Sequence, residues 1–302
     1  MMIVRVPATS ANLGPGFDCL GLALNLYLEV RAEASRCDEF FYRGEGSLPN
    51  HPDTLVHEGF RAVYRQLMRE APRVRFYASN PIPLARGLGS SSAALVAGAA
   101  LADAWLHYPL GRDGVFELCA GLEGHPDNVA PAVYGGFTVS AWDGGAYSCE
   151  VLPLPEAWTL LFAVPDFELL TSHARAILPS HYPRQDVIFN SSRSALWALA
   201  VALDKPHLLR VASQDSVHEP YREVLIPGMA ACRARLLKAG AAAVYLSGAG
   251  PTLAAISLDS ETNARCREAM RAFAGKKGRI LTLRSSQGYH YQQDVPGDEV
   301  GW

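Results

Sequence analysis

Two kinds of hydrophobic pattern alternate along this chain. Runs rich in β-branched and aromatic residues, bounded by glycine, proline or polar residues, are typical of strands. Apolar residues spaced three or four positions apart are typical of helices. Strands are predicted at 2–6, 20–30, 74–78, 137–140, 158–164, 241–246 and 253–256. Helices are predicted at 54–68, 93–106, 113–122, 171–178, 190–204 and 229–239, and a last helix and strand in about 261–283.

Prolines divide this pattern near its middle. Pro153 and Pro155 flank a single leucine, and we predict a boundary there between domains 1–155 and 156–302. The tail from Arg284 is expected to be loosely ordered. The helix predicted at 190–204 has one apolar face, made of Leu196, Leu199, Ala200 and Leu203.

A loop rich in glycine and serine precedes the most apolar of these helices. Gly87 and Gly89 are followed by Ser90, Ser91 and Ser92. Glycine allows a close approach of the backbone to a ligand, serine favours a helix start, and the free N–H groups of a first helical turn bind phosphate. No lysine follows the glycines, and the pattern G-x-G-x-x-G is absent, so neither common nucleotide-binding motif is present. Taken alone, the loop fits a phosphate site or a tight turn before a buried helix.

Two further polar segments carry candidate chemistry. Pro7 is expected to end the first strand, so that 8–16 forms a loop with Asn12, followed by Asp18. Side chains in such a loop can form a site, or they can bond their own backbone in a capped turn. The glycine turn SGAGPT, at 247–252, has a similar composition.

A second cluster follows the helix predicted at 113–122. It contains Glu123, His125, Asp127 and Asn128 within six residues. These residue types also favour a plain polar turn. The cluster is a poor zinc site, because no second histidine stands at a suitable spacing to act as a ligand. Magnesium fits better, since it takes one or two carboxylates together with phosphate oxygens.

Composition narrows the class of protein. The 302 residues are 49% hydrophobic and 19% charged, which is typical of a globular enzyme. A net charge of −3 argues against nucleic-acid binding. Six scattered cysteines without C-x-x-C spacing suit a reduced compartment. The N-terminus does not read as a signal peptide and the apolar stretch at 93–106 contains Asp103, so we expect a cytoplasmic protein without a membrane span.

The three glycine turns ATSANLGPGFD, GLGSSSAA and SGAGPT resemble, in order and spacing, the three motifs of the GHMP small-molecule kinases. Pro83 to Ser91 is similar to the family's phosphate-binding motif P-x-x-x-G-L-G-S-S. The segments PATSANLGPGFDCLGLAL, HPDNVAP, ARAILPSHYPRQD and EPYREVLIPG resemble the homoserine kinase branch of that family. The resemblance extends over about residues 3 to 256.

The resemblance implies an α+β fold and a kinase activity. An N-terminal mixed-sheet domain would bind ATP, and a ferredoxin-like C-terminal domain would help to enclose the substrate. ATP and Mg²⁺ would serve to phosphorylate the side-chain hydroxyl of L-homoserine, in threonine biosynthesis. Relatives are often dimers, so a homodimer is expected. A kinase for mevalonate or a sugar, or a ligand sensor without turnover, are the alternatives.

The resemblance also implies roles for individual residues. The nucleotide would contact Pro83, Leu84, Ala85, Arg86, Gly87, Leu88, Gly89, Ser90, Ser91, Ser92, Ala93, Gly248 and Gly250. The amino acid would contact Asn12, Asp18, His125, Asp127, Asn128, Arg175 and Arg222. The two arginines match a carboxylate-binding pair, and planar guanidinium groups suit that task. Asp18 would face the ammonium group.

The metal and the catalytic groups follow from the same alignment. Ser91, Ser92 and Glu123 are expected to hold Mg²⁺, with Glu117 as the alternative if the alignment shifts. Glu123, Asn128 and Thr171 are the catalytic candidates. Some relatives have an aspartate base where this chain has Asn128. Because an amide cannot take a proton, catalysis is expected to depend on aligning the hydroxyl and stabilising the transition state.

Overall fold

The computed structural model describes the chain except for residues 1, 47, 49–50, 52 and 294–302. Its larger sheet has seven strands in the part described, with β5 and β6 attached to β2. They are β1 (Met2–Ala11), β2 (Leu20–Ala34), β3 (Glu39–Gly44), β4 (Val74–Asn80), β5 (Phe137–Trp142), β6 (Tyr147–Leu152) and β11 (His290–Gln293). The sheet is mixed, because β3 and β4 pair in parallel while the other pairs are antiparallel.

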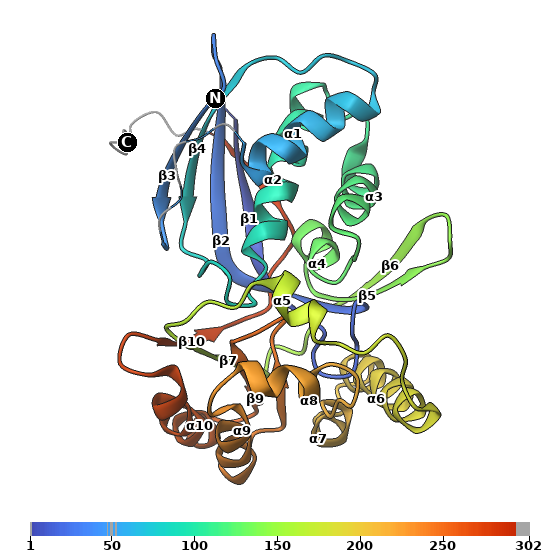
Figure 1. Cartoon of the computed structure of the whole chain (residues 1–302), viewed down its shortest axis with the longest axis vertical. Coiled ribbons are helices and arrows are strands. Elements are labelled where there is room, and N and C mark those ends of the chain that lie inside the picture. The colour runs from blue at the N-terminus through green and yellow to red at the C-terminus, as the bar shows by residue number, and fades with distance from the viewer. Residues whose placement is uncertain (1, 47, 49–50, 52, 294–302) are drawn as a thin grey trace.

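Helices cover one face of this sheet (Figure 1). They are α1 (Leu55–Gln66), α2 (Ser90–Trp105), α3 (Gly111–Glu123) and α4 (Val129–Tyr134). The central helix α2 is almost entirely buried, and its alanines and Gly98 let α1 and the sheet approach closely. The small side chains of the sequence therefore place the N-terminus of α2 in the middle of the molecule.

The smaller sheet has the order β10-β7-β9-β8 and is antiparallel. Its strands are β7 (Thr159–Val164), β8 (Ala243–Leu246), β9 (Leu253–Ser257) and β10 (Arg279–Leu283). The helices of this half are α5 (Thr171–Ala176), α6 (Arg184–Ala202), α7 (Leu209–Ala212), α8 (Glu219–Arg222), α9 (Met229–Lys238) and α10 (Ser260–Ala274). This strand order, with helices between the first and second strands and between the third and fourth, is the predicted ferredoxin-like arrangement.

Strand β7 has the sequence TLLFAV, which is apolar at every position after Thr159, because both faces of the strand are buried. Leu160 and Phe162 belong to the large core that includes the first sheet, while Leu161 and Ala163 pack in a second core with α9 and α10. Both faces of the strand are therefore buried. A strand buried on both faces shows no polar alternation.

Several local predictions are wrong. Strand β1 does not end at Pro7 but continues to Ala11, because the pairing register with β2 shifts between Pro7 and Ala8 and accommodates a residue without an N–H. The loop predicted at 8–16 therefore begins only after Ala11. Helix α6 begins at Arg184 rather than at the predicted position 190, and the helix face that carries Trp197 is buried.

The expected apolar face of α6 is also wrong in part. Leu199 and Leu203 are 48% and 55% exposed, whereas Trp197 is fully buried.

The predicted loose tail is wrong for its first part. After Arg284 the chain returns to the large sheet, where β11 pairs with β1. Tyr291 in β11 donates a hydrogen bond to Ala100 O at 2.8 Å, which anchors the strand on α2. Residues 294–302 of that prediction lie outside the described residues.

The division at residues 155 and 156 stays a prediction, because the larger core draws side chains from both sheets and β11 links the C-terminal segment to the first sheet.

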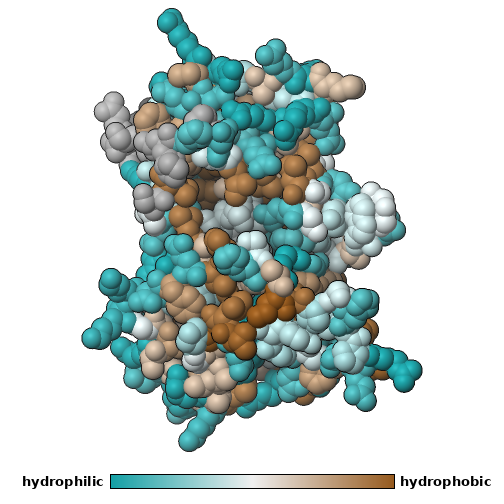
Figure 2. All heavy atoms as spheres, in the orientation of Figure 1, coloured by the Kyte–Doolittle hydropathy of each residue, from teal (hydrophilic) through white to brown (hydrophobic). Residues whose placement is uncertain are grey.

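In the face shown in Figure 2, apolar side chains gather around the middle and hydrophilic ones cover most of the two ends. None of the helices in the described part of the chain is both long and apolar enough to span a bilayer.

Candidate active site

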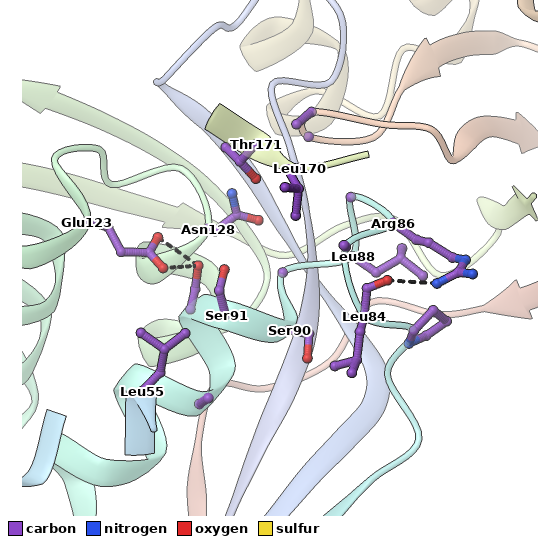
Figure 3. Close-up of a pocket in the computed structure, with 18 of the residues that line it drawn as sticks. Leu55, Leu84, Arg86, Leu88, Ser90, Ser91, Glu123, Asn128, Leu170 and Thr171 are labelled. Atoms are coloured by element: carbon purple, nitrogen blue, oxygen red, sulfur yellow. Dashed lines mark hydrogen bonds between the residues drawn. The ribbon is translucent and has the colours of Figure 1, made fainter. Parts of the chain in front are cut away.

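A cavity of about 620 Å³ opens beside the N-terminus of α2. Its lining combines the serine loop with residues of the first polar loop, the turn after α3, helix α5 and the second glycine turn (Figure 3). Segments that lie far apart in the sequence thus meet at one site. The lining also includes apolar residues such as Phe40, Leu48 and Leu55.

Hydrogen bonds hold the three glycine turns together. The hydroxyl groups of Ser10 and Ser247 lie 2.7 Å apart, and Ser247 Oγ donates to Gly87 O at 2.6 Å. Asn12 Nδ2 donates to Gly248 O at 3.1 Å, while Asn12 Oδ1 accepts the N–H of Asp18 at 3.0 Å. Asn12 therefore makes the local turn bond and a contact between turns as well.

Helix α2 begins without a capping side chain. Its N-cap is Gly89 in the left-handed conformation (φ 67°), so the serines do not cap the helix as the sequence suggested. The N–H groups of the first turn consequently keep no side-chain partner and border the cavity. Ser91 is exposed there, and Ser90 Oγ accepts a bond from Asn80 Nδ2 at 3.0 Å. Such a helix start attracts an anion.

Glu123, the last residue of α3, lies against this helix start. Ser92 Oγ lies 2.8 and 2.7 Å from its two carboxylate oxygens. Dashed lines at the Glu123 carboxylate in Figure 3 mark these two contacts. Burial raises the pKa of Glu123, and the charge of His125 and the bond from Ser92 only partly oppose that effect. Glu117, in contrast, accepts the backbone N–H of Tyr147 at 3.0 Å and does not line the cavity. The geometry favours Glu123 over Glu117 as a cation ligand.

The turn after α3 holds a chain of polar side chains. His125 Nδ1 lies 2.7 Å from Asp127 Oδ1, and Asn128 Nδ2 lies 3.5 Å from the same oxygen. Thr9 Oγ1 donates to Asn128 Oδ1 at 2.8 Å. Burial lowers the pKa of His125, but the hydrogen bond and charge of Asp127 and the charge of Glu123 outweigh it, so the net pKa is raised.

The two arginines differ in their surroundings. Arg175 Nη1 donates to Asp18 Oδ2 at 3.0 Å, and its Nη2 bonds the other oxygen of the same carboxylate. Arg222 is fully buried: its Nε donates to Ala174 O and its Nη1 contacts His218 Nδ1 and Gly248 O. Burial and the nearby charge of Arg175 lower the pKa of Arg222 to about 10.

An aromatic ring lies beside both guanidinium groups. The Cζ atoms of Arg175 and Arg222 are each 5.3 Å from the centroid of the Phe17 ring. The ring quadrupole attracts each cation, which reduces the cost of holding two positive charges close together. The arginines therefore form a preassembled cationic corner of the cavity, next to the carboxylate of Asp18.

Asp18, His125 and Asp127 form a second group of possible metal ligands in the described residues, with ligand atoms within 4.8 Å of one another. Asp18 already binds Arg175, and Asp127 binds His125. A cation there would lie beside a guanidinium group, so this cluster suits a charged organic group better than a metal.

Most of the predicted site residues line the cavity, but a few do not. Asp18, Ala93 and Gly250 are outside the lining. Arg86 lines it, yet its guanidinium donates to the carbonyl oxygens of Pro165 and Leu84, and it points away from the start of α2 (Figure 3). Its bonds brace the loop against the chain after β7. Thr171 is exposed and lines the cavity.

The sequence reasoning missed several lining residues. They are chiefly the apolar residues on β3, on β4 and at the start of α1, together with Asn80, Leu169, Leu170 and Ala249. The apolar members are ordinary core types and carry no local signal, and the missed polar residues Asn80, His51 and Asp53 belong to no motif that the sequence analysis identified. It also missed Thr9, whose contact with Asn128 joins residues 119 positions apart.

Comparison with known proteins gives consistent matches in sequence and structure. The family models described as "GHMP kinases N terminal domain" and "GHMP kinases C terminal" match residues 55–136 and 195–276. A homoserine kinase of Thermus thermophilus is 50% identical over 95% of this chain and 97% of its own length. One from Moorella thermoacetica is 43% identical over 94% and 96%. The crystal structure of homoserine kinase from Cytophaga hutchinsonii has a TM-score of 0.85 and 26% identity, with 96% and 97% of the two chains covered.

Proposed function

The chain belongs to the homoserine kinases of the GHMP kinase family, and we propose that it transfers the γ-phosphate of ATP to the side-chain hydroxyl of L-homoserine. One observation carries this function: a single cavity borders both an open helix N-terminus and a cationic corner next to a carboxylate. The first feature suits phosphate. The second suits an α-amino acid, which brings one carboxylate and one ammonium group.

The nucleotide would bind along the serine loop. The N–H groups at the start of α2 would donate to its phosphates, and the apolar wall formed by Phe40, Leu48 and Leu55 would accept the base. Gly87 is held by Ser247, so that the loop is tied to the second glycine turn before any ligand arrives. A loop fixed in advance loses little conformational entropy on binding.

The amino acid would bind at the cationic corner formed by Arg175 and Arg222. The pair of Asp18 and Arg175 already holds one negative and one positive charge in contact. A zwitterionic substrate can exchange into such a pair, with its ammonium at Asp18 and its carboxylate at Arg175 and Arg222. Two opposite contacts of this kind select an amino acid over an alcohol or a hydroxy acid.

The residues near the acceptor hydroxyl suit positioning. Asn128 has no basic atom, and Asp127 holds the Nδ1 side of the His125 ring at 2.7 Å, which fixes the orientation of that imidazole. We therefore assign to these groups the orientation of the hydroxyl and the binding of charge. Phosphoryl transfer depends largely on such positioning.

Magnesium is part of the proposal. A carboxylate that burial makes costly to ionise, beside Ser92 and the exposed Ser91, has the oxygen donors that Mg²⁺ prefers. Bound there, the ion would neutralise charge on the phosphates. Ser91, Ser92 and Glu123 are the residues that would hold it. A homodimer and a cytoplasmic location stay predictions from the resemblance.

An ADP-release assay tests the proposed function. The purified chain with ATP and Mg²⁺ is offered L-homoserine, L-serine, 3-aminopropan-1-ol, mevalonate and galactose, and the product is identified by mass. We expect turnover with homoserine at a kcat/KM at least about a hundredfold above the amino alcohol, which lacks the carboxylate and its charge-assisted bonds. Preferred turnover of mevalonate or galactose, or no turnover of homoserine, would contradict the proposal.

A further inference from the structure

Thr9 lies at the point where β1 passes under the start of α2, and it is fully buried. Its N–H donates to Leu88 O at 3.1 Å, which ties the strand to the serine loop. Its hydroxyl occupies the space beside Gly89, where an added Cβ would come within 1.8 Å of Thr9 Oγ1. Thr9 thus fits against a residue that has no side chain.

The same hydroxyl bonds the side-chain amide of Asn128. Thr9 Oγ1 donates to Asn128 Oδ1 at 2.8 Å, and on the other side Asn128 Nδ2 lies 3.5 Å from Asp127 Oδ1. The two contacts select the same orientation of the amide. The reverse orientation would bring Oδ1 of Asn128 against the carboxylate of Asp127, where two acceptors repel each other.

This orientation decides what Asn128 offers to a ligand. The amide oxygen is used by Thr9, and the amide nitrogen lies on the side of Thr171 in the cavity (Figure 3). Asn128 therefore presents an N–H donor. A donor at this place can bind the oxygen of an acceptor hydroxyl and fix its direction.

We infer that Thr9 is a positioning residue for the reaction: by bonding Asn128 Oδ1 it keeps the amide nitrogen of Asn128 directed at the acceptor hydroxyl, and through Leu88 it ties that amide to the phosphate-binding loop. The inference rests on the proposed function. It adds a residue that touches neither ATP nor homoserine but links the elements that hold them.

Three substitutions test the role of the hydroxyl. Thr9→Ala and Thr9→Val remove it, and Thr9→Ser keeps it. Loss of the hydrogen bond leaves the amide of Asn128 free to rotate, so kcat should fall about tenfold in the first two variants. The KM values for ATP and for homoserine should stay within about twofold of the parent, and Thr9→Ser should keep most of its kcat.

A double mutant separates this role from a purely structural one. In an Asn128→Ala background, Thr9→Ala should cause little further loss of kcat, because the residue on which Thr9 acts is absent. If Thr9→Ala instead lowers kcat by the same factor in both backgrounds, or if kcat is unchanged in Thr9→Ala and Thr9→Val, the inference is wrong. If either variant proves unfolded, the other and Thr9→Ser still decide: loss of kcat in Thr9→Ser also overturns it. Failure of the parent to phosphorylate homoserine contradicts the proposed function instead.

Discussion

Glu123 has surroundings unlike those of the other acidic side chains in the site. Asp18 bonds Arg175 and Asp127 bonds His125, whereas in the described part of the chain the basic atom within 4 Å of the Glu123 carboxylate is His125 Nδ1, at 3.9 Å. Its side chain is 13% exposed, and burial raises its pKa. A carboxylate kept from water without a close positive partner is costly. A divalent cation would supply the missing charge.

Replacement of Glu123 by glutamine should therefore have opposite effects on activity and on stability. With Mg²⁺ and ATP, kcat should fall by at least about a hundredfold, because metal coordination supplies several kcal/mol of charge stabilisation. Without Mg²⁺, Glu123→Gln should melt at a higher temperature than the parent at pH 8. The folded pKa of Glu123 is raised, so its charged form costs stability above that pKa; the difference should begin to shrink as the pH falls through the folded pKa and should vanish near the ordinary pKa of an unfolded glutamate.

Glu117→Gln is the matched control for this experiment. Glu117 lies on the same helix and bonds the backbone of Tyr147. It should lose some stability and keep its dependence on Mg²⁺. The assignment of the metal ligand is contradicted if Glu117→Gln loses the dependence on Mg²⁺ and Glu123→Gln keeps it.

Residue type alone could predict which side chains gather in the site, but not how they pair. Arg175 and Arg222 were expected to act together, and both line the cavity. Their partners could not be predicted: Asp18 is 157 positions from Arg175, and the buried bonds of Arg222 depend on how α8 packs. A pattern along the chain records neither a distance of this kind nor the burial of a charge.

Close contact between α1 and α2 fixes one wall of the nucleotide end. A Cβ on Gly98 would lie 1.9 Å from Val56 O, and a Cβ on Gly59 would lie 2.1 Å from Leu95 O. The two helices thus touch through their backbones. Leu55 and Val56, at the start of α1, line the cavity. The spacing of the two helices therefore affects the shape of the site.

The substitution Gly98→Ala should separate these helices. The added methyl group meets backbone atoms, which cannot turn away, so we expect a loss of about 1–3 kcal/mol in the free energy of unfolding. The KM for ATP should rise severalfold, while the KM for homoserine changes less. Urea unfolding and steady-state kinetics measure the two effects.

Gly121→Ala on α3 is a suitable control, because nothing lies within 4 Å of its added Cβ. It should stabilise the protein by up to about 1 kcal/mol, through helix propensity alone. If Gly98→Ala and Gly121→Ala had the same free energy of unfolding and the same KM for ATP, the contact between α1 and α2 would not be as tight as its geometry indicates.

Elements with a strong local pattern could be predicted well. The serine loop, the helix α1 and the apolar strand β7 stand close to where the sequence indicated. Strand β11 could not be predicted, because the sequence HYQQ has no apolar alternation and becomes a strand only by pairing with β1. The exposed leucines of α6 have the same cause, since Trp197 determines which side is buried. Tertiary packing outweighs local preference in both cases.

The two sheets share one hydrophobic core. Residues from β1, β2 and α2 belong to the same cluster as Leu160 and Phe162 of β7 and Ile256 of β9. Strand β11, near the C-terminus, adds a further link by pairing with β1. The cavity has lining residues from both halves, so we expect the shared core to hold its two sides together.

Tyr289, which leads into β11, offers a test of that connection. It is 4% exposed, its N–H donates to Ala132 O at 2.8 Å, and its ring lies 4.3 Å from Arg112 Cζ. Tyr289→Ala removes a large buried ring and should lower the free energy of unfolding by about 3–5 kcal/mol. Since the core is shared, hydrogen exchange should report the same decrease for the amides of β2 and for those of β9, in the other sheet. Val224→Ala, at a position 76% exposed, should leave the hydrogen exchange of the amides in both β2 and β9 unchanged. A decrease confined to β2 would mean that the halves unfold separately, and that the common core does not join them into one cooperative unit.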